Sequence, residues 1–382
     1  MYKLFYFLHP VELLKKFIKI AIVSKEIFLN KITYYPKSVI NFETNFAKYI
    51  GCDYGLTFCN GTSSIESAMF ALGIQKGDEV IVPSNTFHAS IDPIINLGAS
   101  PVFVDVEKGC LTISKEQIIN KITPKTKCIV IVHIFGYIAD IKQIAQIARD
   151  NNIFLLEDCS HAHGGMFENK KIGSFGDIGC FSLQGAKAIA AGEGGVAVTN
   201  NKKLFAKMSM YGHFTRHQNL FSIDDDKYKF TGVGHKQRAH PLGIVLANID
   251  LKFINFYNNK MLKNEKIIKK IIKEIDCIKL FEPVLSTKSG GFFGGLPILV
   301  NKETDVNKVK NIFSSCGIQV FHYPFELNHK LDIYNQDENN TLINTEYLKE
   351  KLILVDRRLL IYLPIVSRLI LKQIVLNLTI KV

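Results

Sequence analysis

Apolar strand-like segments and helical patterns alternate from residue 41 onward, and this alternation limits most strongly the folds open to the chain. The strand-like segments cover residues 79–82, 101–104, 128–132, 153–156 and 178–181, and a recurrence of about 25 residues leaves room for one helix between neighbours. Helical patterns cover residues 63–72, 90–97, 114–122 and 141–149. Repeated strand–helix units predict an α/β fold with a mostly parallel sheet and helices on both faces.

The length and composition predict more than one packed unit. The chain has 382 residues, of which 47% are hydrophobic and 21% are charged, so it can bury one large core and a smaller one. We predict an amphipathic N-terminal arm at 1–40 and a large α/β domain at 41–250. A long helical pattern follows Pro241, and we assign residues 251–382 to this helix and a small C-terminal α/β domain.

The net charge and the cysteines limit the kinds of partner and the cellular compartment that we expect. The formal net charge is +12, but the lysines are spread over the whole length, which favours anionic small molecules or reflects composition alone. We find no nucleic-acid recognition motif and expect no nucleic-acid partner. The eight cysteines form no Cys-x-x-Cys pair, which favours reduced thiols and a cytoplasmic location.

The N-terminal arm has a pattern of its own. Residues 11–27 have the spacing of an amphipathic basic helix. Charged residues interrupt the apolar stretch around it, so we expect neither a membrane-spanning helix nor an export signal. Such a helix can make a weak contact with an anionic membrane surface. The interpretation that we favour is that it packs on its own protein or on a partner subunit.

Reactive and aromatic residues follow the predicted strand ends. Phe87 comes after the first of these strands, Asp158 and His161 after the fourth, and Ser182 and Lys187 after the fifth. Ligands of parallel sheets bind at the carboxyl ends of the strands. We therefore expect a reaction site at this edge.

Lys187 is the candidate nucleophile of this site. It lies in a loop of small and apolar residues that leads into Gly192-Glu-Gly-Gly195. Partial desolvation lowers the pKa of a lysine, and an uncharged amine can condense with a carbonyl group. The alternative interpretation is an ordinary solvated loop lysine.

Asp158 and the segment Asn60-Gly-Thr-Ser63 each have a structural and a functional interpretation. A carboxylate at the end of a buried strand needs a cation or strong donors, so Asp158 either caps a helix or pairs with the protonated nitrogen of a pyridine cofactor. In the segment 60–63, Thr62 or Ser63 caps the next helix, or the N–H groups and hydroxyls there hold a phosphate.

Two aromatic features near the same edge also have alternatives. Phe87 either belongs to the core or stacks on a planar ring. His161 and His163 lie beside Asp158 and suggest a metal site. No third Cys or His pair with suitable spacing accompanies them, so we expect no metal.

Taken together, the chain resembles the DegT/DnrJ/EryC1/StrS family, the fold-type I pyridoxal 5'-phosphate (PLP) enzymes that aminate keto sugars. The resemblance is strong over about residues 41–255 and weaker elsewhere, and several long motifs in the same order make it specific. The motifs are Asn60-Gly-Thr-Ser63, Gly77-Asp-Glu-Val-Ile-Val-Pro-Ser-Asn-Thr-Phe87, Pro101-Val-Phe-Val-Asp105, Glu157-Asp-Cys-Ser-His-Ala-His-Gly164, and Gly173-Ser-Phe-Gly-Asp-Ile-Gly-Cys-Phe-Ser182 followed by Lys187 and Gly192-Glu-Gly-Gly195.

The resemblance implies roles for four residues around the cofactor ring. Lys187 would hold PLP covalently, and Asp158 would pair with the pyridine nitrogen. Phe87 would stack on the ring. His161 occupies the position where the family usually has Gln and would lie near the ring hydroxyl.

The resemblance also implies a phosphate site that two subunits share. Thr62, Ser63 and Ser182 would bind the phosphate, together with Gly61 at the start of the same helix. Lys236 occupies the position of an Asn that reaches the phosphate of the neighbouring subunit's PLP. The resemblance therefore implies a homodimer with sites at the interface.

By this resemblance the protein is a PLP-dependent transaminase. It would move an amino group from glutamate or glutamine to a keto sugar, expected to be nucleotide-linked, in surface glycan or amino-sugar biosynthesis. Lys187 would transfer the protons, and Gln184, Glu193 and His322 are candidate substrate contacts. Family members that dehydrate have His at the position of Lys187, so the lysine favours aminotransfer.

Other activities stay open from the sequence. The same fold serves PLP enzymes with another acceptor, such as a cyclic ketone, or with lyase or dehydratase chemistry. A regulatory or binding homologue without turnover is a further alternative. Such a homologue would be expected to lack Lys187 or Asp158, and this chain has both.

Overall fold

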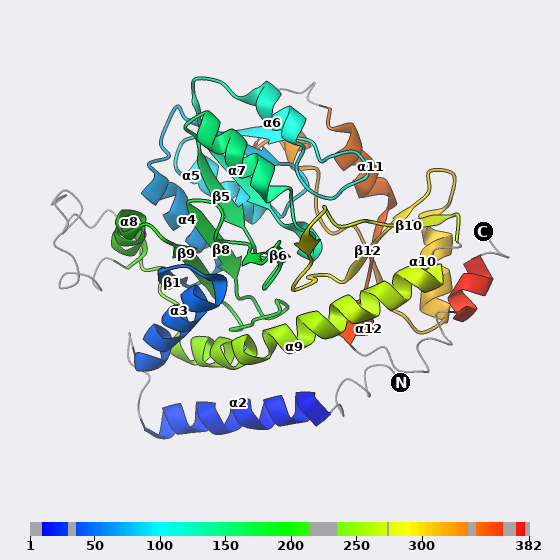
Figure 1. Ribbon diagram of the computed structural model, residues 1–382, viewed down its shortest axis with the longest axis horizontal. Helices are drawn as coiled ribbons and strands as arrows, with labels where there is room; N and C mark the ends of the chain where they lie inside the picture. Colours follow the sequence, from blue (N-terminus) through cyan, green and yellow to red (C-terminus); the bar gives the residue numbers. More distant parts are fainter. Residues whose placement is uncertain are drawn as a thin grey trace.

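A seven-stranded sheet with the strand order β1-β9-β8-β5-β4-β2-β3 forms the centre of the computed structural model, which describes residues 10–29, 36–213, 235–272, 275–334, 341–361 and 372–378 (Figure 1). Within this sheet β9 runs against the other strands, because it pairs antiparallel with β1 and β8 while the remaining pairs are parallel. The predicted mostly parallel sheet is confirmed. Its strands are β1 (Tyr54–Phe58), β2 (Glu79–Pro83), β3 (Ser100–Val104), β4 (Thr126–Val132), β5 (Phe154–Asp158), β8 (Ile178–Ser182) and β9 (Gly195–Thr199).

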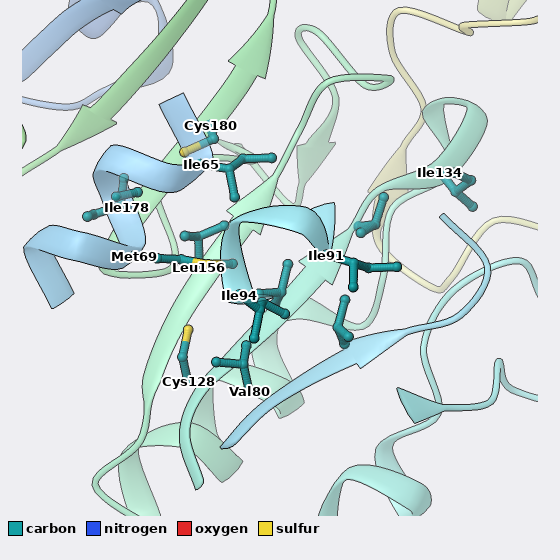
Figure 2. Packing of buried hydrophobic residues seen from close by; sticks show 14 of the residues in the cluster. Ile65, Met69, Val80, Ile91, Ile94, Cys128, Ile134, Leu156, Ile178 and Cys180 are labelled. Carbon is teal, nitrogen blue, oxygen red and sulfur yellow. The ribbon is translucent and has the colours of Figure 1, made fainter. Parts of the chain in front are cut away.

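Helices cover both faces of this sheet, as the alternation predicted. Side chains of successive strand residues point to opposite faces, so Val80 and Val82 join one core and Ile81 joins another. The first core lies under α4 (Gly61–Leu72), α5 (Asp92–Asn96) and α8 (Lys202–Gly212). Cores on the opposite face lie under α3 (Lys37–Ile50), α6 (Lys115–Lys121) and α7 (Ile141–Asp150). Figure 2 shows part of the first core, where Ile65, Met69 and Ile94 pack over Cys128, Leu156 and Ile178.

The helix predicted at residues 90–97 is divided in the structure. A 3-10 turn, η1 (His88–Ser90), ends before Ile91, and α5 begins at Asp92. Pro93 lies in the first turn of α5, where its missing N–H removes no helical hydrogen bond. The proline therefore starts a new helix rather than continuing the first one.

A second, antiparallel sheet has the strand order β10-β12-β14-β13. Its buried apolar residues pack with the second half of α9 (Pro241–Ile272) in a separate core. The elements of this part are β10 (Ile278–Leu280), β12 (Leu296–Val300), α10 (Val306–Ser315), β13 (Val320–His322), η4 (Asn328–Lys330), α11 (Ile343–Lys351), β14 (Leu352–Val355) and α12 (Arg357–Ile361). The other short elements are η2 (Ile134–Gly136) and a small sheet of β6 (Met166–Phe167), β7 (Lys170–Lys171) and β11 (Thr287–Lys288).

The boundary predicted at residue 250 falls inside α9. Ile244 and Ile254 of this helix belong to a core of the large sheet, whereas Met261 and Ile268 belong to the core of the second sheet. A continuous helix thus links both parts, as Figure 1 shows. Of the terminal parts, residues 1–9, 362–371 and 379–382 lie outside the described residues.

The N-terminal arm forms α2 (Pro10–Phe28), which lies alongside α9 (Figure 1). Its charged side faces the body, because Lys15 and Lys19 pair with the buried Asp250 of α9. Part of its apolar stripe is uncovered, since Phe17 and Ile20 are 68% and 63% exposed, whereas Val11 packs on the core of the second sheet. The expected packing of this helix on its own protein is therefore seen along α9, while packing of the exposed part of the stripe on a partner subunit stays a prediction. Within the described residues, no helix is long and apolar enough to cross a membrane.

Candidate active site

A cavity of about 460 Å³ lies at the carboxyl end of the large sheet. Val132, Asp158 and Ser182, which end β4, β5 and β8, all line it. Nine of the residues that we predicted for the site line this one cavity: Gly61, Thr62, Phe87, Asp158, His161, Ser182, Gln184, Lys187 and Glu193. The parallel strands therefore gather these side chains as the sheet-edge argument predicted.

One end of the cavity is formed by the start of α4. The first backbone N–H groups of a helix have no acceptor inside it, so those of Gly61 and Thr62 are available to an anion. Asn60 is the N-cap, because its side chain accepts from the Ser63 N–H at 2.7 Å. A Cβ on Gly61 would lie 2.8 Å from the Cβ of Ser182, so glycine lets the helix start approach the end of β8.

Asp158 is buried and receives hydrogen bonds on both oxygens. Ser90 Oγ donates to Oδ2 at 2.7 Å, and the Ser160 N–H donates to Oδ1 at 3.0 Å. Ser90 is also 2.9 Å from Thr86 Oγ1, so a chain of hydroxyls orients this carboxylate. Asp158 therefore has its position set by donors of the chain while it lines the cavity.

The loop that carries Lys187 is held by backbone hydrogen bonds. The Lys187 N–H donates to the Gln184 carbonyl at 2.8 Å, and the Gly185 N–H donates to the Gly192 carbonyl at 2.8 Å. Ala190 N–H donates to Asp250 Oδ2 at 3.1 Å, which ties the loop to α9. These contacts fix the backbone from which Lys187 reaches into the cavity.

The Lys187 amine has a pKa suited to chemistry near neutral pH. Burial lowers its pKa from 10.5 to about 7, the Asp158 carboxylate opposes this change, and the Arg357 guanidinium adds to it. The amine nitrogen lies 3.5 Å from the centroid of the Phe293 ring. A substantial fraction of the amine is thus uncharged at pH 7 and able to act as a nucleophile or base.

His161, which lines the same cavity, is a neutral imidazole. Burial lowers its pKa well below 6.5, and the charges of Lys187 and His163 act in the same direction. Its Nδ1 accepts from the Phe135 N–H at 3.3 Å, so the ring proton is on Nε2. The His161 ring stacks on Phe293 at 4.2 Å between centroids. The residue can therefore offer an N–H donor to a ligand.

Phe293 and Ser90 were not predicted as site residues. A signal for Phe293 was present, because Gly290-Gly-Phe-Phe-Gly-Gly295 places two aromatics between glycine pairs. Gly291 has φ +69°, and a Cβ there would lie 2.8 Å from the His161 carbonyl oxygen. The glycines thus let this segment approach the loop after β5 and bring Phe293 to Lys187. Ser90 carried no comparable signal, since a serine near a helix start is usually a cap.

Three predicted site residues do not line the cavity. Ser63 is buried, and its hydroxyl lies 3.3 Å from Cys59 Sγ. His322 lies on β13 and is exposed, and Lys236 is also exposed. Lys236 was predicted for the cofactor of a neighbouring subunit, so its role stays a prediction.

Three other predicted residues line the cavity at its exposed rim. Phe87 is 49% exposed, so its alternative interpretation as a core residue is wrong. Gln184 uses its side-chain oxygen to accept from the Ala186 N–H at 2.8 Å, which shapes the turn before Lys187. Glu193 is exposed in the following turn.

A buried group of potential metal ligands lies outside this cavity, formed by His133, Glu157 and Cys159. Glu157 accepts backbone N–H groups of Gly173, Phe175 and Gly176 at 2.7 Å each. His133 Nδ1 accepts from the Ala139 N–H at 3.2 Å, so its other nitrogen is the donor to Glu157. With these lone pairs engaged, the group serves to hold the loop at 173–176.

The family model described as the DegT/DnrJ/EryC1/StrS aminotransferase family matches residues 21–359. The chain belongs to this family. The match is longer than the region of about 41–255 over which the motifs were strong, and it includes the second sheet.

The chain spans about half the length of the curated relatives that it matches. The GDP-perosamine synthase of Escherichia coli O157:H7 is 45% identical over 164 residues, which are 43% of this chain and 45% of that protein. The GDP-perosamine synthase of Vibrio cholerae is 42% identical over 171 residues, which are 45% of this chain and 47% of that protein.

Solved structures confirm the predicted fold class. An aminotransferase from Psychrobacter cryohalolentis has a TM-score of 0.83 and 25% identity, and the match covers 94% of this chain and 95% of that one. A GDP-4-keto-6-deoxymannose-3-dehydratase with a trapped PLP-glutamate geminal diamine has a TM-score of 0.81 and 22% identity, with 94% and 97% covered. The second likeness concerns the fold alone. The central α/β sheet is thus that of the fold-type I aminotransferases.

Proposed function

We propose that this protein is a PLP-dependent aminotransferase that moves the amino group of glutamate or glutamine to a nucleotide-linked keto sugar. The observation that carries the proposal is the desolvated amine of Lys187, with a pKa of about 7, in the cavity that also contains Asp158 and the start of α4. A phosphate-bearing aldehyde with a ring nitrogen needs an amine, an anion site and a carboxylate, and this cavity supplies all three.

The donors around the cavity fit PLP group by group. The N–H groups of Gly61 and Thr62 and the hydroxyl of Ser182 would hold the phosphate. Asp158 would pair with the ring nitrogen, and the Nε2–H of His161 would donate to the ring oxygen. Phe87 at the rim would cover the ring. When bound, PLP supplies an electron sink for the bonds at the substrate Cα.

Lys187 would act twice in the reaction. It would first hold the cofactor and then, once displaced by the donor amine, accept the Cα proton and return it at the cofactor carbon. Above a pH of about 7 the amine is mostly uncharged, so it can accept that proton. The same residue would move the proton in the opposite direction when the keto sugar receives the nitrogen.

The acceptor class is proposed from the relatives and from the charge. Both curated relatives described above are GDP-perosamine synthases, and this name contains a nucleotide-linked sugar. The net charge of +12 favours an anionic diphosphate-linked substrate. Gln184 and Glu193 at the rim are the proposed substrate contacts. His322, on β13 of the second sheet, is a further candidate.

Assembly and location belong to the same proposal. We propose a homodimer in which Lys236 of one copy lies near the phosphate site of the other. The exposed apolar stripe of α2 supports contact with a partner, and weak contact with a membrane surface is the alternative outcome. Sedimentation of the protein alone and with anionic vesicles separates the two.

All eight cysteines are free thiols, which supports a cytoplasmic location.

The test is the visible absorbance of the purified protein supplied with PLP. We expect an absorption band that glutamate removes and that a keto-sugar nucleotide restores. Borohydride should fix the cofactor to the wild type but not to Lys187→Ala. No protein-bound band after unbound PLP has been removed, or a fixed link that persists in Lys187→Ala, would overturn the proposal. A band that glutamate leaves unchanged would favour lyase or other chemistry instead.

A further inference from the structure

The loop of residues 84–87, which joins β2 to η1, carries part of the candidate active site. Thr86 and Phe87 line the cavity of about 460 Å³. The Thr86 hydroxyl lies 2.9 Å from Ser90 Oγ, which donates to the Asp158 carboxylate at 2.7 Å. The conformation of the 84–87 loop therefore decides where the aromatic ring at the rim lies and how the carboxylate is oriented.

Asn328 of η4 holds the backbone of the 84–87 loop. Its side-chain Nδ2 donates to the Ser84 carbonyl at 2.9 Å and to the Thr86 carbonyl at 2.7 Å. An amide nitrogen has two N–H groups, so both of them are used on this loop. Asn328, Ser84 and Thr86 are all buried, so water does not readily replace these hydrogen bonds. One side chain from the part of the chain around the second sheet thus fixes two carbonyls of the loop.

His329, the neighbour of Asn328, holds the side chain of Ser84. Burial lowers the pKa of His329 below 6.5, so its ring is neutral near pH 7. Its Nε2 lies 3.1 Å from a carboxylate oxygen of Glu346 and carries the proton, so Nδ1 accepts from the Ser84 hydroxyl at 2.7 Å. Ser84 is fully buried, so this Ser–His–Glu group holds the loop rather than supplying a nucleophile.

Tyr323 makes a further contact with the 84–87 loop. Its hydroxyl donates to Asn85 Oδ1 at 2.6 Å, and both residues are buried. Phe325, which follows shortly after Tyr323, lines the cavity, and its ring centroid lies 6.3 Å from that of Phe87. The segment at 323–329 therefore forms one wall of the cavity and also holds the loop that forms the facing wall.

We propose that Asn328 and Tyr323 are positioning residues for PLP, which act by fixing the 84–87 loop. The inference rests on the proposed PLP-dependent function. The fixed loop places Phe87 over the cofactor ring and orients Asp158 through two hydroxyl groups. Without the Asn328 amide, two buried carbonyls lose a donor, and the loop gains freedom to turn toward other partners.

Asn344 offers a matched control for Asn328. Its Nδ2 donates to the Val106 carbonyl at 3.0 Å, so it also links α11 to the end of the large sheet, but neither of these two residues lines the cavity. We expect both Asn328→Ala and Asn344→Ala to unfold at lower urea concentration than the wild type. Titration with PLP, followed by absorbance, should show about fivefold weaker binding in Asn328→Ala, the effect of one neutral hydrogen bond. Asn344→Ala should bind PLP as the wild type does.

Hydrogen exchange of the full chain without PLP gives a second measurement that needs no cofactor. In Asn328→Ala the amides of residues 84–90 should exchange faster, whereas those of residues 105–107 should keep the wild-type rate. Asn344→Ala should give the reverse pattern. Tyr323→Phe removes a single donor to the loop, so it should change the exchange of residues 84–90 and the PLP affinity in the same direction by a smaller amount.

A merely structural role would lower the stability of both asparagine variants and leave the PLP affinity alone. The inference is therefore wrong if Asn328→Ala binds PLP as Asn344→Ala does, or if its residues 84–90 exchange at the wild-type rate. If Asn328→Ala does not fold, the same comparison is made with Tyr323→Phe, and unchanged PLP affinity in that variant overturns the inference. Absence of a protein-bound PLP band in the wild type counts against the proposed function instead, and the exchange rates still report on the loop.

Discussion

The amine nitrogen of Lys187 lies 3.5 Å from the centre of the Phe293 ring. The two residues are far apart in the sequence, since Lys187 lies between β8 and β9 and Phe293 lies just before β12 of the second sheet. The ring face attracts the ammonium form, while burial favours the neutral amine. Burial is the stronger effect, since the pKa of Lys187 is lowered to about 7. We expect Phe293 to oppose the change of pKa that burial imposes, as the Asp158 carboxylate does.

This relationship predicts how covalent capture of PLP depends on pH. The rate of capture should rise as the pH increases through about 7, because the neutral fraction of Lys187 increases. Phe293→Leu removes the attraction for the ammonium form, so the midpoint should move to lower pH. Stopped-flow absorbance over a pH series measures both midpoints. Phe256→Leu is the control, because Phe256 is exposed on α9 and does not line the cavity. Equal midpoints for the two variants would contradict the role of Phe293.

The same pKa predicts a pH dependence of folding stability. The unfolded chain holds the Lys187 proton up to about its ordinary pKa of 10.5, whereas the folded chain releases it near 7. The unfolded state thus binds more protons in this window, so the contribution of Lys187 to the free energy of unfolding rises with pH from 7 to 10.5. Urea unfolding of wild type and Lys187→Met, without PLP, should give a difference that follows this rise. A difference independent of pH would show that the amine is not desolvated.

The hydroxyl of Ser90 should matter for cofactor binding. Ser90→Ala removes the 2.7 Å hydrogen bond to Asp158 Oδ2, so the carboxylate loses part of its orientation. Because hydrogen bonds to charged groups contribute about 1.5–3 kcal/mol, we expect PLP affinity to fall about tenfold or more. Titration of each variant with PLP, followed by the absorption band, measures this affinity. Thr86→Val acts one hydrogen bond further away and should have a smaller effect; an equal or larger loss would contradict this order.

Gly61 should be required for the contact between α4 and β8. In Gly61→Ala the new Cβ would lie 2.8 Å from Ser182 Cβ, so the helix start must move and the free energy of unfolding should fall by about 1–3 kcal/mol. PLP affinity should fall too, because the phosphate donors move with the helix. Adding Ser182→Gly removes the 2.8 Å contact but leaves the Cα of residue 182 at 3.1 Å, so it should restore part of the stability. PLP affinity should not recover, since the hydroxyl is then absent. Recovery of both would argue against Ser182 as a phosphate ligand.

Asp250 should control the attachment of α2. Asp250→Asn leaves Lys15 and Lys19 without their shared carboxylate, and these lysines are only partly exposed. We expect a loss of about 2 kcal/mol in the free energy of unfolding, or release of α2 at a similar cost. Hydrogen exchange over residues 10–28 measures the release. In Lys25→Gln, a change at an exposed residue of the same helix, protection should persist. Unchanged protection in Asp250→Asn would mean that α2 is held by other contacts.

Residues close together in a motif could be predicted as site members from the sequence. Asp158, Ser182 and Lys187 follow strand ends, and a parallel sheet brings such positions to one edge whatever the loops do. Phe293 comes from a segment more than a hundred residues later, whose approach depends on how the second sheet packs. Ser90 was missed because its partner, Asp158, is close only in three dimensions. Ser63 was placed in the phosphate site because it belongs to the motif, but its hydroxyl pairs with Cys59.

The sequence by itself determined the central sheet and the family, because strand–helix periodicity and ordered motifs are local properties of the chain. Only the tertiary structure decided the environment of Lys187 and the orientation of α2. The pKa of an amine depends on which surfaces exclude water from it, and those surfaces come from segments that no local pattern links. The amphipathic pattern of α2 likewise specifies two faces, but the buried Asp250 of a distant helix decides which face turns inward.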